Sequence, residues 1–278
     1  MKSRAYSHGM ATYALAEAYG MTRIPMLRSP MEQALQRIID GQQARGGFDY
    51  RYKKGKRWDM SVSGWQFQAL KAGYVAGASN EGLEEAIRES LGFLKNVCYG
   101  GPGFGYSSPG TRPNLTGAGA VCMQLLGEGD RKEVDTAVEY VGTKRLAQYQ
   151  KVLKNPREWE TVAGKCLYGW YYDTQAIFNA QKTPKGKALW KEWRPVFEKV
   201  LMRAQHHEGY WETGKGHGMG ASLDGRILST CWAALQLEVY YRYLPTFDIK
   251  KMDQHKVEAL GIGNEGADGG GLILEVED

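Results

Sequence analysis

The stretch Gly64-Trp65-Gln66-Phe67-Gln68-Ala69-Leu70 decides the fold, because a similar pattern of small and apolar residues recurs four more times along the chain. The five segments close on Leu15, Leu70, Leu125, Ile177 and Leu235, which stand 55, 55, 52 and 58 positions apart. Each segment is apolar nearly all round, which is typical of a helix that is buried on both sides. A repeat of this length predicts stacked helical units that bury one continuous core.

Amphipathic stretches separate these segments, at residues 30–43, 80–97, 130–150 and 184–205. In the second stretch, Leu83, Ile87 and Leu91 recur at helical spacing, with charged residues on the opposite side. The alternation of buried and half-exposed helices, with few strand signals, predicts an all-α protein.

Two architectures fit this alternation. In an α/α toroid, an outer ring of amphipathic helices surrounds an inner ring of buried helices, whereas in a right-handed solenoid the same helix pairs stack along a line. We favour the toroid because the inner segments are too apolar to line an open concave surface. Five inner and four outer helices are fewer than a closed ring needs, so we expect an incomplete ring, as in a piece of a longer polypeptide.

The composition supports one folded domain with a different C-terminal segment. The chain has 278 residues, of which 36 are glycine, only 9 are proline and 12% are aromatic. The aromatic content argues against disorder, and no apolar run approaches the roughly 18 residues of a membrane-spanning helix. The net charge of +5 is unevenly placed, because residues 251–278 hold seven acids against two lysines. We therefore expect a toroid domain over residues 1–250 and an acidic, glycine-rich tail over residues 251–278.

The chain start and the cysteines bear on the compartment. The first residues lack the apolar core of a secretory signal. Cys98, Cys122, Cys166 and Cys231 are scattered and include no Cys-x-x-Cys pair, which favours buried thiols over disulfides or a zinc site. Both observations predict a cytoplasmic protein, and no metal or other cofactor is expected.

Two turns that follow amphipathic stretches share glutamine, glycine and an aromatic residue in the same order. They are Gln42-Gln43-Ala44-Arg45-Gly46-Gly47-Phe48 and Gln205-His206-His207-Glu208-Gly209-Tyr210-Trp211. Both resemble the repeats of the superfamily of squalene–hopene cyclases and protein prenyltransferase β-subunits, and the likeness covers roughly residues 5–245. The resemblance implies an α/α toroid that holds an apolar, isoprenoid-type ligand in a central cavity.

The chain departs from this superfamily at the residues that carry the reaction. Squalene–hopene cyclases protonate an alkene with an Asp-x-Asp-Asp motif, whereas the matching stretch here is Arg57-Trp58-Asp59-Met60-Ser61-Val62. It holds one carboxylate and places Trp58 where the proton donor would be. Protein prenyltransferases hold zinc with Asp, Cys and His, but the similar segment Ser229-Thr230-Cys231 lacks the histidine. The enzyme hypothesis is therefore an isomerase or lyase of the terpene cyclase type rather than a prenyltransferase.

Asp59, Asp173 and His8 are the candidate catalytic residues. Asp59 stands eleven residues before Leu70, so it acts either as a helix N-cap, the interpretation that also fits Asn114, or as a general acid or base. Asp173 lies in an apolar helix, where a carboxylate is costly unless it is paired. His8 falls in the first turn of an expected inner helix, where a packing role is the alternative to a role as a base.

Seven aromatic residues are candidate ligand-binding residues, because their faces could hold a greasy or carbocationic ligand through cation–π contacts. The alternative is a purely structural role in the core. The residues are Trp58, Trp65, Tyr168, Trp170, Tyr172, Trp211 and Trp232.

A run of basic residues precedes Trp58 and would lie at the mouth of the ring. It consists of Arg51, Lys53, Lys54, Lys56 and Arg57. The run is either a solvated loop or an anion-binding rim for a diphosphate, an acidic peptide or a lipid headgroup. No basic helix or stacking platform indicates nucleic acid as a partner. The adjacent residues His206, His207 and Glu208 do not by themselves predict a metal site, because no further ligand follows at a defined spacing.

Two functions are therefore open. In the first, a terpene cyclase-like protein binds or transforms an apolar small molecule in a central cavity, with Asp59 as the acid. In the second, a non-catalytic toroid binds a protein or a polymer through its basic mouth or its outer face. Neither function needs a transmembrane segment, and peripheral contact with a membrane surface is compatible with the basic run.

Overall fold

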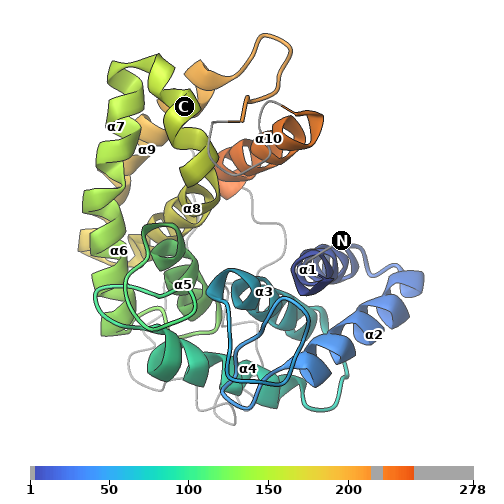
Figure 1. Ribbon diagram of the computed structural model, residues 1–278. Coiled ribbons are helices and arrows are strands. Elements are labelled where there is room, and N and C mark those ends of the chain that lie inside the picture. Colours follow the sequence, from blue (N-terminus) through green and yellow to red (C-terminus); the bar gives the residue numbers. More distant parts are fainter. Residues whose placement is uncertain (1–3, 214–221, 241–278) are drawn as a thin grey trace.

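The computed structural model describes residues 4–213 and 222–240, which form ten α-helices and no β-strand (Figure 1). The helices are α1 (Arg4–Thr22), α2 (Pro25–Gly41), α3 (Met60–Ala76), α4 (Leu83–Phe93), α5 (Pro113–Leu125), α6 (Lys132–Lys144), α7 (Leu146–Lys154), α8 (Trp159–Asn179), α9 (Pro184–Ala204) and α10 (Leu223–Leu237). The all-α prediction is confirmed. The expected tail at residues 251–278 and the end of the expected domain, residues 241–250, lie outside the described residues.

The helices form an inner and an outer layer. The five repeated segments fall in α1, α3, α5, α8 and α10, and each of these helices contacts the next one in the series. The amphipathic stretches form α2, α4, α6, α7 and α9, which pack against the inner helices. In Figure 1 the helix pairs follow one another along an open arc, with α1 and α10 at its two ends. The closed toroid stays a prediction.

Burial of the inner helices depends on their place in the arc. Every residue of α3 except Tyr74 and Val75 is buried, and α5 is similarly enclosed. The expectation of burial on both sides is wrong for the two end helices. Helix α10 leaves Leu223, Ile227 and Leu235 exposed along one side, and α1 is buried along one face only. Helices α3, α5 and α8 each lie between two other inner helices, whereas α1 packs mainly against one inner helix, α3, and α10 mainly against one, α8, among those described. The second side of each end helix is therefore not covered by a described helix.

The first turns of the inner helices test the predicted caps. Asp59 is the N-cap of α3, and its Oδ1 accepts hydrogen bonds from two backbone amides of the first turn at 2.9 and 3.3 Å. The prediction of a cap at Asn114 is wrong, because α5 begins one residue earlier, at Pro113, with Arg112 in the cap position. Proline favours the first position of a helix because its φ angle is fixed at a helical value. The prediction counted eleven residues back from Leu125 and did not consider this preference of Pro113.

The expected outer helix at residues 130–150 is interrupted. Helix α6 ends at Lys144, α7 begins at Leu146, and Arg145 between them is only 2% exposed. The amphipathic pattern continues across the break, so periodicity alone did not reveal it. The break places a guanidinium in the core, next to α8.

The two glutamine–glycine turns have the same local structure. Gln42 Nε2 donates to the carbonyl of Gly46 at 2.9 Å, and Gln205 Nε2 donates to the carbonyl of Gly209 at 3.0 Å. Gly46 and Gly209 have φ angles of 83° and 90°, a left-handed region that favours glycine. Gln42 also donates to Ser90 Oγ at 3.1 Å, which ties its turn to α4. The shared hydrogen bonds support the repeat that the sequence indicates.

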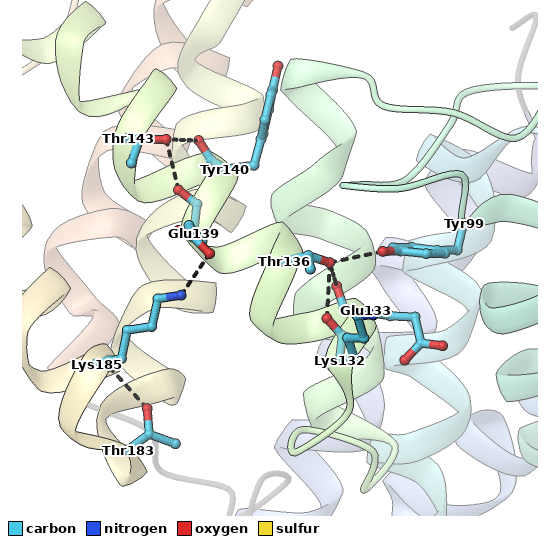
Figure 2. Close-up of polar contacts among 10 residues, drawn as sticks. Tyr99, Lys132, Glu133, Thr136, Glu139, Tyr140, Thr143, Thr183 and Lys185 are labelled. Atoms are coloured by element: carbon cyan, nitrogen blue, oxygen red, sulfur yellow. Dashed lines mark hydrogen bonds and ion pairs between the residues drawn. The ribbon is translucent and has the colours of Figure 1, made fainter.

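Polar contacts fasten α6 to its neighbours (Figure 2). The Tyr99 and Thr136 hydroxyls lie 2.9 Å apart, and Lys185 Nζ lies 2.7 Å from Glu139 Oε2. The Lys185–Glu139 pair joins α9 to α6 and is more than half exposed, so it contributes little to the free energy of unfolding. The layers are therefore held mainly by apolar packing.

The described residues test two further expectations, on membrane-spanning helices and on the cysteines. None of the described helices combines the length and the apolar character needed to cross a bilayer. Cys98 and Cys122 are buried thiols as expected, but Cys231 is exposed, because it lies on the uncovered side of α10. The side chain of Cys166 lies outside the described set.

Candidate functional site

Asp59 is fully buried at the start of α3. Its Oδ1 accepts hydrogen bonds from the Ser61 amide at 2.9 Å and from the Ser61 hydroxyl at 2.6 Å. Its Oδ2 is buried and has no hydrogen-bond partner. The helix N-terminus stabilises the negative charge of a carboxylate in this position. Asp59 therefore combines a structural oxygen, Oδ1, with an oxygen that makes no well-formed hydrogen bond.

Two tyrosines from separate loops face this carboxylate. The hydroxyls of Tyr50 and Tyr106 lie 2.7 Å apart. Burial raises the pKa of both phenols, and the negative charge of Asp59 raises the pKa of each further. The backbone supports this arrangement, because the Met60 amide donates to the Tyr106 carbonyl at 2.8 Å.

Tyr6 of α1 brings a third phenol to Asp59. Burial raises the pKa of Tyr6 to about 12, while contacts with Tyr168, Trp65 and Ser61 lower it and the charge of Asp59 raises it. Trp65 Nε1 and the Tyr168 hydroxyl are buried and make no well-formed hydrogen bond, so their interaction with the Tyr6 hydroxyl is a loose one. We call Asp59, Ser61, Tyr6, Tyr50 and Tyr106 the Asp59 cluster.

An aromatic face lies beside the Asp59 cluster and is built from α3, α8 and α10. We define it as Trp65, Tyr168, Tyr171, Tyr172 and Trp232. The ring of Trp232 lies 6.0 Å from that of Trp65, 5.4 Å from Tyr168 and 5.1 Å from Tyr171, and the ring of Tyr172 lies 6.1 Å from Trp65. Four of the five residues are buried, and Tyr168 is half-buried. The aromatic face therefore belongs to the core, as expected if these rings have a structural role. It also lies next to Asp59 Oδ2, and it contains Trp65 Nε1 and the Tyr168 hydroxyl.

Three predicted ligand-binding residues lie elsewhere. Trp58 packs edge-on against Phe93 at 5.0 Å, towards the outer layer. Trp170 stacks on Tyr149 at 3.7 Å. Trp211 donates from Nε1 to a backbone carbonyl at the end of α9. Of the seven predicted aromatic residues, only Trp65, Tyr168, Tyr172 and Trp232 come together, because the other rings fill contacts between helices.

Asp173 is not part of the Asp59 cluster. It is fully buried in α8, and its Oδ2 accepts a hydrogen bond from Arg145 Nε at 2.8 Å. Arg145 also donates to Asn114 Oδ1 at 2.9 Å. Burial raises the pKa of Asp173 to about 6, and the charge of Arg145 acts in the opposite direction. This ion pair supplies the partner that a buried carboxylate needs, and it ties α8 to the junction of α6 and α7.

His8 supports a loop rather than the Asp59 carboxylate. Its Nδ1 lies 2.7 Å from the Tyr52 hydroxyl, and that hydroxyl donates to Gln66 Oε1 at 2.8 Å. Burial lowers the pKa of His8, and the nearby charge of Arg37 lowers it further. The contacts join α1, the loop before α3 and α3 itself.

The five predicted anion-binding residues stay together. Arg51, Lys53, Lys54, Lys56 and Arg57 are all exposed on the loop between α2 and α3. They line a cleft of about 630 Å³ together with Asp49, Tyr50 and Gly55. Tyr50 belongs to both the cleft and the Asp59 cluster, so the two sites are adjacent.

The turn after α9 brings three possible metal ligands together. Ligand atoms of His206, His207 and Glu208 all lie within 4.8 Å of one another. His207 and Glu208 are exposed, and Tyr210 stacks on His206 at 4.3 Å. All three ligands come from one solvent-facing turn, so the arrangement adds no buried or distant ligand to the pattern in the sequence.

Sequence reasoning missed several residues of these sites. Tyr6, Tyr50 and Tyr106 reach Asp59 from separate segments, and Arg145 reaches Asp173 across 28 positions. The only signal for Arg145 was the apolar setting of Asp173, which requires a cation but does not say which one. The tyrosines carried no signal, because glycine-rich loops and aromatic residues occur throughout this chain.

The comparisons with known proteins assign no role to these residues. No protein-family model matches the chain, and no curated protein matches it. The resemblance to the squalene–hopene cyclase superfamily therefore stays a prediction.

Proposed function

We propose that this protein binds an apolar, isoprenoid-type small molecule against the aromatic face, with Asp59 as its polar anchor and proton donor. The observation that carries the proposal is a group of three buried polar atoms that make no well-formed hydrogen bond and face the phenols of Tyr6, Tyr50 and Tyr106. The atoms are Asp59 Oδ2, Trp65 Nε1 and the Tyr168 hydroxyl. All three belong to residues that lie around Tyr6.

The cost of these atoms supports a binding role. A buried donor or acceptor that lacks a partner costs about 1–3 kcal/mol, and native proteins keep few of them. A ligand with one polar group could satisfy Asp59 Oδ2, Trp65 Nε1 or the Tyr168 hydroxyl, while the rings of the aromatic face cover its apolar part. Ligand sites commonly combine apolar walls with a few polar groups in this way.

The same residues suit a proton transfer. A protonated Asp59 can donate its proton to a carbon–carbon double bond, which leaves a carboxylate and a carbocation. Trp65, Tyr172 and Trp232 would then stabilise the cation through the faces of their rings. Loss of a proton from the carbocation to the Asp59 carboxylate would then give a rearranged alkene and restore the acid, so the step needs no other reactant.

The test is the retention of apolar ligands by the purified chain, measured by native mass spectrometry and organic extraction. We expect a bound apolar molecule, and binding of added squalene or prenyl compounds that is at least about tenfold weaker for Asp59→Asn and Tyr168→Phe. Tyr140→Phe on α6 is the matched control and should bind like the wild type.

Absence of any apolar ligand in all four proteins, with no product from squalene or prenyl diphosphates, would contradict the proposal. That result would favour the alternative, a non-catalytic scaffold that binds a protein or polymer through the basic loop. Equal binding by wild type and Asp59→Asn would keep a ligand but remove Asp59 from the site.

A further inference from the structure

The loop between α2 and α3 presents an unusual concentration of charge. Arg51, Lys53, Lys54, Lys56 and Arg57 line one cleft of about 630 Å³, which is large enough for a small anion or a lipid headgroup. Gly55 at the tip has no heavy atom within 4 Å of the position that a Cβ would occupy, so the cleft is open to solvent there. We call residues 49–57 the basic loop.

The cations of the basic loop are not neutralised by the fold. Among the residues that the structure describes, none of the five forms an ion pair. Asp49 is the one carboxylate in the lining, and its Oδ1 accepts hydrogen bonds from the backbone amides of Arg51 and Lys53 at 2.8 and 2.7 Å. Five like charges around one cleft repel each other, and a bound anion would relieve that repulsion.

The backbone of the basic loop is held in place from several sides. Gln43 Nε2 donates to the carbonyls of Lys53 and Arg57 at 2.9 and 2.8 Å. The Tyr52 hydroxyl forms hydrogen bonds with His8 and Gln66. The backbone of Tyr52 has a positive φ angle of 57°. A loop that is already ordered loses little conformational entropy when it binds a ligand.

The charged groups suit phosphate chemistry. Two guanidinium groups can each give paired hydrogen bonds to phosphate oxygens, and three ammonium groups add point charges. The guanidinium of Arg57 lies 5.4 Å from the centre of the Tyr50 ring, which restricts its position. A neighbouring cleft shares Lys54 and Gly55 but adds the carboxylate of Glu85 and no further cation, so the cations are concentrated in one place and fit a compact anion better than a long polymer.

We propose that the basic loop binds a compact phosphate-bearing group, supplied either by a free diphosphate or by the phosphomonoester headgroup of a lipid. This site is separate from the aromatic face and does not depend on the proposed function.

The test uses the full chain with two probes. Isothermal titration measures inorganic diphosphate, and flotation measures vesicles of phosphatidylcholine with and without phosphatidic acid. The loop variant Lys53→Gln/Lys56→Gln changes two exposed side chains, and Lys187→Gln/Lys191→Gln on α9 is the control with the same change in net charge. We expect binding of at least one probe to weaken about tenfold in the loop variant and to stay unchanged in the control.

The results distinguish a free diphosphate from a lipid headgroup as the source of the phosphate group, and they can also overturn the proposal. Binding of diphosphate assigns the site to a free anion, and binding only of vesicles that contain phosphatidic acid assigns it to a headgroup. Lack of binding to both probes overturns the proposal. It is overturned equally if the α9 control loses as much affinity as the loop variant. Circular dichroism of both variants confirms that they are folded.

Discussion

Asp59 and Asp173 are both fully buried on inner helices, yet the fold treats them differently. Asp173 Oδ2 is paired with Arg145 at 2.8 Å, while its Oδ1 is buried without a hydrogen-bond partner. Asp59 has no ion pair among the described residues and is held by Ser61 and by the first turn of α3. The comparison teaches that burial alone does not mark a functional carboxylate. Each acid keeps one buried oxygen without a well-formed hydrogen bond, so the difference between them is the cation. Asp173 is paired with Arg145, whereas Asp59 is held by neutral donors at the N-terminus of α3.

Removal of the cation should produce the largest effect. We expect Arg145→Met to lower the free energy of unfolding by about 3–5 kcal/mol, because it leaves Asp173 buried without a partner. Urea unfolding measures the change. The double variant Arg145→Met/Asp173→Leu is the control and should recover most of the loss, because it removes both buried charges. A loss below about 1 kcal/mol in the single variant would show that the pair does not neutralise Asp173.

The pH dependence of stability tests the same pair. The pKa of folded Asp173 is about 6, above its ordinary value of 3.8, so its stabilising contribution is present below pH 3.8 and is lost as the pH rises through 6. We compare wild type with Arg145→Gln/Asp173→Asn, which keeps the shape but not the charges. The difference in unfolding free energy should fall by about 2 kcal/mol between pH 4 and pH 7. A difference that grows with pH would mean that Arg145 outweighs the effect of burial.

Asp59 should be less important for stability than Asp173. We expect Asp59→Ala to cost about 1 kcal/mol through loss of the N-cap, while Asp59→Asn, which keeps a capping oxygen, costs only a few tenths. Thermal unfolding measures both values, and Asp224→Asn on the first turn of α10 serves as a control outside a cap position. If Asp59→Asn lowered the free energy of unfolding as much as Arg145→Met does, the two buried acids would not differ in their importance for stability.

Much of the fold could be predicted from the sequence because the decisive interactions are local. The closing residues at intervals of about 55 positions identified all five inner helices, and the place of Asp59 before an apolar run identified a cap. The break at Arg145 was missed because the amphipathic pattern continues through it. The exposed side of α10 was missed because its composition equals that of an enclosed inner helix.

The candidate site could be predicted only in part. The basic loop stays together because its five cations lie within seven consecutive positions. The aromatic residues divide into those that meet around Trp65 and those that fill other contacts, and their composition is the same in both groups. Which rings converge depends on how α3, α8 and α10 pack, and that packing is not encoded in any one segment.

The sequence by itself determined the helical repeat, the charge of the basic loop and the cap at Asp59, because each depends on residues that are close along the chain. Only the tertiary structure decided that Asp173 meets Arg145 and that Tyr6, Tyr50 and Tyr106 surround Asp59. Those contacts join segments that are far apart in sequence, and the packing of whole helices, rather than any local pattern, sets which side chains share a buried volume.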